Sequence, residues 1–165
     1  MTDALPSSLA RRITTRDWSA FAQELDRHGS AIIGSLLTPD ECATLAASYA
    51  DDARFRSRII MSRHGFGRGE YKYFAYPLPN LIAALREALY APLARIANGW
   101  NEILGERLRY PDEHSAFLDR CHAAGQSRPT PLLLQYGEGD YNCLHQDIYG
   151  EHVFPLQVEI GRAHV

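Results

Sequence analysis

The spacing of hydrophobic residues predicts the first elements of the chain. A helix is expected over 17–28, where apolar side chains recur every three or four residues and Gly29 ends the run. The short apolar run 31–37 predicts a strand. Residues 38–41 read Thr-Pro-Asp-Glu, a capping box with proline at the first helical position, so a second helix is expected to begin there. The first dozen residues are interpreted as a loose arm.

Beyond residue 57 the pattern predicts strands, then helices, then strands again. The expected elements are, in chain order, a strand at 58–62, a glycine-rich turn at 65–69, a strand at 71–76, helices at 81–89, 93–104 and 113–124, and strands at 132–136, 141–147 and 152–158. No internal repeat, low-complexity segment or linker interrupts this order. The expected fold class is therefore α+β.

The composition is that of a globular protein and excludes several classes. Hydrophobic residues make up 45% and charged residues 22% of the 165 positions, and the net charge of −3 gives no overall attraction to nucleic acid or membrane. The three cysteines form no C-x-x-C pair, which argues against a disulfide framework or a zinc knuckle. No apolar run is long enough for a secretory signal or a membrane span, so a cytoplasmic location is expected.

One segment departs from this average. Residues 54–72 hold six Lys or Arg against one acidic residue, Glu70, and aromatic rings alternate with the cations. Cations that contact phosphates and rings that stack on bases would suit a nucleic-acid lid. The alternative is a solvated hairpin whose rings pack inward. The candidate lid residues are Arg63, Phe66, Arg68, Tyr71, Lys72 and Tyr73.

The strongest candidate for chemistry is the pair His145 and Asp147. On a strand, residues two apart point to the same side, so an imidazole and a carboxylate would enter one space. Such a pair supplies two ligands of the 2-His-1-carboxylate triad, which leaves open positions on non-haem Fe(II). By itself the H-x-D pattern is common, and an isolated copy is more typical of a surface turn.

The surrounding residues resemble known families. AlkB-like nucleic-acid oxygenases carry a tyrosine nine residues before an H-Q-D, in a frame that Tyr136, Gly139, Leu144 and His145–Asp147 fill here. The longer stretches 63–79, 121–126 and 141–157 resemble a bacterial family of predicted 2-oxoglutarate–Fe(II) oxygenases described as acting on damaged DNA.

The resemblance implies a role for each matching residue. His145 and Asp147 would bind Fe(II), and Tyr136 would donate a hydrogen bond to a carboxylate of the co-substrate 2-oxoglutarate. Leu134 stands where the AlkB-like pattern has an asparagine. The implied reaction consumes O₂ and demethylates alkylated DNA or RNA bases, and it favours the lid reading of the basic segment. The implied architecture is N-terminal helices packed on a double-stranded β-helix, or jelly-roll, core.

The resemblance also places two functional groups beyond Val165: the distal histidine ligand and the arginine that pairs with 2-oxoglutarate. His152 lies too close to Asp147 in sequence to replace that histidine. The expectation is therefore a single truncated domain over 1–158 with an incomplete jelly roll, inactive by itself. Residues 159–165 leave the apolar pattern and are expected to be an artefactual tail. Two alternatives remain open: a protein or small-molecule hydroxylase of the prolyl-hydroxylase type, and a non-catalytic binding fragment.

Overall fold

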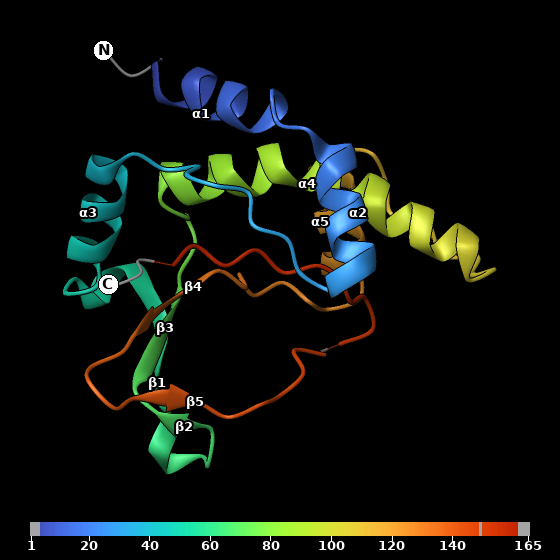
Figure 1. The fold of residues 1–165 in the computed structure, drawn as a ribbon. Coiled ribbons are helices and arrows are strands. Elements are labelled where there is room, and N and C mark those ends of the chain that lie inside the picture. Colours follow the sequence, from blue (N-terminus) through green and yellow to red (C-terminus); the bar gives the residue numbers. More distant parts are fainter. Residues whose placement is uncertain (1–3, 149, 162–165) are drawn as a thin grey trace. The chain divides into compact units, whose positions relative to one another are not determined.

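The structure is a computed structural model that describes residues 4–148 and 150–161, with side chains from residue 8 onwards (Figure 1). The chain divides into two compact units, Met1–Ala88 with Ser127–Asp147, and Leu89–Gln126 with Ile148–Val165. The expected mixture of helices and antiparallel sheet is confirmed. Residues 162–165, which belong to the expected tail 159–165, lie outside the described residues.

The first unit begins with a helix where a loose arm was expected. Helix α1 spans Ala4–Thr14, and Leu9 and Ile13, one turn apart, are fully buried. Residues four apart share one helix face, so this short apolar stripe is sufficient to fix the segment against the unit. The prediction of an arm was wrong because it gave the polar residues more weight than this pair.

The next two helices confirm the predictions made from capping residues. Helix α2 (Trp18–His28) is capped by the Asp17 side chain and ends at Gly29, whose φ is 70°. Helix α3 (Pro39–Ser48) begins with the complete capping box, in which Thr38 and Glu41 satisfy each other's backbone N–H groups. These caps depend on local sequence alone, and the helices therefore follow directly from it.

Two small antiparallel sheets complete the first unit. The three-stranded sheet has the order β1-β3-β4 and the two-stranded sheet pairs β2 with β5. Their bounds, with two short 3₁₀ turns, are η1 Asp52–Arg54, β1 Phe55–Ile60, η2 Met61–Arg63, β2 Gly67–Arg68, β3 Glu70–Phe74, β4 Leu132–Gln135 and β5 Tyr141–Asn142. β3 occupies the centre of the larger sheet, and its Phe74 is fully buried.

In the described residues two expected strands are absent, and a third is reduced to two residues. The run 31–37 is irregular, since Gly34 has φ 62° and the Arg16 guanidinium bonds the Ser35 carbonyl in place of a partner strand. The strand expected at 141–147 ends at Asn142, because its partner β2 is two residues long. Residues 152–158 are also irregular. An extended segment needs a hydrogen-bonded neighbour to become a strand, and apolar composition does not supply one.

The second unit is built around aromatic rings. Helix α4 (Asn80–Ile103), which begins in the first unit, continues through Pro92 where two separate helices were expected, and α5 spans His114–Ala123. The rings of Tyr90, Tyr110, Phe117 and Phe154 lie 4.9–5.8 Å apart between centroids. Burial raises the pKa of Tyr90 to about 12. Phe154 thus anchors the irregular C-terminal segment by ring packing.

None of the described helices has the length and apolar character that crossing a membrane requires. This holds for α4 too, the longest of them, because polar and charged residues interrupt its apolar positions.

Candidate functional site

The structure brings His145 and Asp147 together, although neither lies in a strand. Their Nε2 and Oδ1 atoms are 3.4 Å apart, and each side chain is about half exposed, at 47% and 46%. The His145 Nδ1 atom lies 2.8 Å from the backbone oxygen of Cys143. A carbonyl can only accept, so Nδ1 carries the proton and Nε2 is the nitrogen that faces Asp147.

This arrangement fits two ligands of one metal ion. Imidazole nitrogen and carboxylate oxygen are the donor types of the non-haem iron triad, and a ring N–H bound to a carbonyl is the usual support of a ligating histidine. Two ligands about 2.1 Å from an ion and about 90° apart lie about 3 Å from each other, close to the observed separation. Within residues 4–148 and 150–161, no third His, Cys, Asp or Glu joins them. His152 lies in the other unit, where its backbone N and O both bond the Gln126 side chain.

The backbone before His145 is held by the β2–β5 ladder. Gly67 pairs with Asn142, and the Cys143 amide continues the ladder with a 2.8 Å bond to the Phe66 carbonyl. Gly67 has φ 122°, and a Cβ placed there would collide with the carbonyl oxygen of Tyr141. Only glycine permits this close approach of the two backbones. The glycine-rich turn is therefore part of the framework that positions His145.

Tyr136 follows β4 and lies elsewhere in the same unit. Its half-exposed ring covers Gly69, where an added Cβ would come within 2.9 Å of it. It lines an open hollow of about 470 Å³ together with Arg68 and Asp140. The residues that line this hollow in the described structure include neither His145 nor Asp147. The role of Tyr136 as a co-substrate contact stays a prediction.

The structure separates the six candidate lid residues into two groups. Lys72 is 5% exposed, and its ammonium donates to the Tyr49 carbonyl at 2.8 Å and to Asp52 at 2.7 Å. Tyr71 and Tyr73 alternate with Lys72 along β3 and therefore lie on the opposite face of the sheet. Arg63, Phe66 and Arg68 instead occupy the exposed turn between β1 and β3. Lys72 is a structural cation rather than an exposed phosphate contact.

A carboxylate network neutralises the sheet face around Lys72. Glu70 accepts hydrogen bonds from the Arg58 guanidinium and, at 2.8 Å, from the Tyr49 hydroxyl. The hydrogen bond from Arg58 holds the pKa of Glu70 below its ordinary value. Partial burial would raise this pKa, but the bond from Tyr49 also lowers it. For Asp52, the hydrogen bond from Lys72 lowers the pKa of the carboxyl.

Sequence reasoning missed one residue in the exposed turn. His64 is not among the candidate residues, yet its ring stacks on that of Phe66 with centroids 5.3 Å apart and planes inclined by 22°. The available signal for this stacking was the position of His64 and Phe66 on either side of Gly65, whose φ is 72°. A reversal at the glycine can bring flanking rings onto one side.

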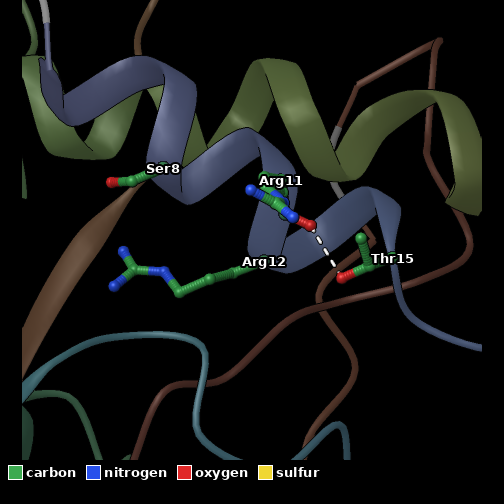
Figure 2. A pocket seen from close by; sticks show the side chains of 4 residues that line it. All are labelled: Ser8, Arg11, Arg12 and Thr15. Carbon is green, nitrogen blue, oxygen red and sulfur yellow. Dashed lines mark hydrogen bonds between the residues drawn. The ribbon is translucent and has the colours of Figure 1, made fainter.

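A second hollow lies along α1 and is lined by Ser8, Arg11, Arg12 and Thr15 (Figure 2). Its best anion-binding group is already engaged, because Arg12 donates to both Glu41 oxygens at 2.8 Å. Partial burial would raise the pKa of Glu41, but the bonds from Arg12 and Thr38 outweigh it and lower that pKa. The Arg12–Glu41 ion pair therefore serves as a structural contact between α1 and α3.

Comparison with known proteins identifies relatives of the chain. Residues 69–164 match the model of a family described as "Oxygenase, catalysing oxidative methylation of damaged DNA". Two uncharacterized proteins of Mycobacterium tuberculosis, from strains CDC 1551 / Oshkosh and H37Rv, are each 52% identical over 88 residues, which is 53% of this chain. The aligned part spans 38% of the length of these curated relatives. No solved structure matches the chain.

Proposed function

The chain belongs to the family of oxygenases described as catalysing oxidative methylation of damaged DNA, and from this premise we propose that it carries the metal-binding segment of an Fe(II)- and 2-oxoglutarate-dependent oxygenase that demethylates damaged bases. The observation that carries the proposal is the His145–Asp147 pair, with Nε2 facing Oδ1 at 3.4 Å. In this proposal β4 and β5 are the first strands of a jelly-roll core in the whole protein.

Each residue has a defined task in the proposed reaction. His145 Nε2 and Asp147 would hold Fe(II), and the Cys143 carbonyl keeps the imidazole in the Nδ1–H tautomer that this requires. Tyr136 would donate its hydroxyl to a 2-oxoglutarate carboxylate. Fe(II) held there would supply O₂ activation, which would couple the conversion of 2-oxoglutarate to succinate and CO₂ with hydroxylation of an N-methyl group, whose carbon would be lost as formaldehyde. The exposed turn with Arg63, Phe66 and Arg68 would contact the nucleic acid.

Metal binding tests the proposal without requiring turnover. Anaerobic titration of the 165-residue chain with Fe(II) should show one site that His145→Ala or Asp147→Ala weakens at least about tenfold, since loss of an outer-shell partner alone costs about 10- to 100-fold. His152→Ala is the matched control, because its contacts with Gln126 run through the backbone. Wild-type affinity in the His145→Ala chain would overturn the assignment.

The substrate class is tested in the whole protein. Methylated oligonucleotides should yield succinate and formaldehyde in equal amounts when Fe(II), 2-oxoglutarate and O₂ are present. Succinate formation with a peptide, without formaldehyde from the oligonucleotide, would instead favour a hydroxylase of the prolyl-hydroxylase type.

A further inference from the structure

The turn between β1 and β3 presents two stacked rings on a fixed backbone. The amides of His64 and Phe66 both donate to the Met61 carbonyl, and the Met61 amide donates to the Gly69 carbonyl, at 3.0–3.1 Å. Met61 itself is fully buried, which anchors the turn. The Phe66 side chain nonetheless remains 45% exposed. The backbone hydrogen bonds therefore hold the turn while one large apolar ring stays accessible to a ligand.

Cations flank these rings. Arg63 and His64 are neighbours in sequence and exposed, and no ion pair in the described part of the chain involves Arg63. Arg68 is also exposed, and its contact with Asp140 at 3.9 Å is long and open to solvent, so the pair contributes little. Two exposed arginines within a few residues of stacked rings suit an unpaired nucleotide, which offers a base face and adjoining phosphates.

The same turn is joined to the candidate metal ligand. In the ladder that Figure 1 shows between β2 and β5, Arg68 lies opposite Tyr141, whose ring is 55% exposed. Cys143 then forms two hydrogen bonds of 2.8 Å: its amide donates to the Phe66 carbonyl, and its own carbonyl accepts from His145 Nδ1. One residue therefore connects the backbone of Phe66 to the orientation of the imidazole.

We propose that His64, Phe66 and Tyr141 form an aromatic platform that stacks unpaired bases of single-stranded DNA, with Arg63 and Arg68 on the phosphates. We further propose that Cys143 couples this platform to His145. The platform stands on the exposed turn and β5 and needs no metal, whereas the coupling rests on the proposed function, because it takes His145 as a metal ligand.

The coupling has a thermodynamic consequence. DNA that immobilises Phe66 also fixes the Cys143 peptide and therefore the direction of His145 Nε2. Linkage requires that DNA raise metal affinity by the same factor as metal raises DNA affinity. A factor of about five or more is expected, at the lower end of measured couplings. Because a base in a duplex has both faces stacked already, duplex DNA of the same sequence should bind more weakly and couple less.

Fluorescence anisotropy with a short single-stranded oligonucleotide tests the platform. Phe66→Ala should weaken binding roughly 5- to 150-fold, the equivalent of one stacked base, and Phe66→Trp should retain it. His64→Ala should weaken binding as well. The matched control is Ile32→Ala, which removes a side chain that is 91% exposed in an irregular segment of the same unit and should change nothing. Wild-type binding by both the Phe66→Ala and His64→Ala chains, or tighter binding of duplex, would overturn the platform.

Two glycine variants test the coupling while leaving all rings and cations in place. Gly67→Ala should push β2 away from the Tyr141 carbonyl. With Co(II) as the probe in place of Fe(II), this change should abolish the effect of DNA on metal affinity. Gly29→Ala is the matched control, since its φ of 70° is also positive and no atom lies within 4 Å of the added Cβ, but it ends α2 instead of lying between the stacked rings. Near-identical circular dichroism spectra are required of both chains. Co(II) affinity that DNA leaves unchanged in the wild-type chain would overturn the coupling, whereas unchanged Co(II) affinity in His145→Ala would overturn the metal assignment itself.

Discussion

Lys72 offers a direct way to separate structural from functional cations in the basic segment. Its ammonium donates to the Tyr49 carbonyl at 2.8 Å and lies 4.3 Å from the centre of the Tyr49 ring and 5.4 Å from that of Phe55. Lys72→Met keeps an unbranched stem of similar size and removes the charge and the donor. We expect this change to destabilise the protein and to leave DNA binding intact.

The magnitude follows from the contacts that are lost. A hydrogen bond from a charged donor contributes about 1.5–3 kcal/mol, and a partly desolvated cation–π contact about 0.5–2 kcal/mol. The methionine recovers part of this, because an apolar side chain carries no desolvation penalty when it is buried. The net expectation is a loss of about 1–3 kcal/mol, or roughly 2–12 °C in Tm for a chain of this size. Asp52 is 81% exposed and stays hydrated in the variant, so its ion pair with Lys72 is not counted in this estimate.

Urea denaturation followed by circular dichroism measures the loss, and salt titration of oligonucleotide binding measures the charge contribution. Arg63→Ala is the matched control, with the opposite expectation: an unchanged midpoint and a log–log salt slope reduced by about 0.7. A Lys72→Met chain that is as stable as wild type, with a shallower salt slope, would show that Lys72 contacts phosphate and does not stabilise the fold.

Two further predictions concern carboxylates and caps. Because the pKa of Glu70 lies below its ordinary value of 4.5, its contribution to stability is complete above that value and is lost as pH falls through the folded-state pKa. Glu70→Gln should therefore lower stability at neutral pH and flatten its decline on acidification, as measured by urea midpoints from about pH 6 to about pH 3; a decline as steep as in wild type would contradict this. Thr38→Ala should cost about 1 kcal/mol of unfolding free energy while Thr38→Ser retains it, since Thr38 accepts from the Glu41 amide at 3.2 Å; equal urea midpoints for the two chains would exclude the cap.

Helices were predictable where their signals are local. Asp17 and Gly29 bound α2, and the reciprocal bonds of Thr38 and Glu41 begin α3, all within a few residues along the chain. Strands were predictable only in part, because pairing depends on what lies beside them. The apolar run 152–158 was given a strand, but Phe154 packs its ring into an aromatic cluster instead. Nothing in the local sequence distinguishes these two uses of one phenylalanine.

The candidate site shows the same division. The spacing of His145 and Asp147 predicted that their side chains would share one space, and the structure places them 3.4 Å apart. The reason differs from the predicted one, since the residues lie beyond the end of β5 and the Cys143 carbonyl directs the imidazole. A sequence motif predicts neither this hydrogen bond to the Cys143 carbonyl nor the stacking of His64 on Phe66 across Gly65. Residue types revealed the candidate ligands, whereas backbone hydrogen bonds supply their orientation.

Charge counting in the basic segment illustrates why burial must be known before binding is argued. Salt bridges engage Arg54 with Asp51, Arg58 with Glu70 and Lys72 with Asp52. The Arg56 guanidinium lies 4.3 Å from the centre of the Tyr73 ring and also bonds the Pro129 carbonyl. These four cations largely serve the sheet and its flanks.

The two cations that remain, Arg63 and Arg68, flank the aromatic platform. Two phosphate contacts give a salt dependence with a slope of only about −1.4 on single strands, whereas five unpaired charges would give about −3.5. Electrostatic attraction of that size supplies weak and sequence-independent association. Base stacking, at about 1–3 kcal/mol for each ring engaged, then has to carry much of the affinity. The proposed platform divides the work in this way: the two arginines would attract single-stranded DNA to the turn, and the exposed rings of Phe66 and Tyr141 would select an unpaired base.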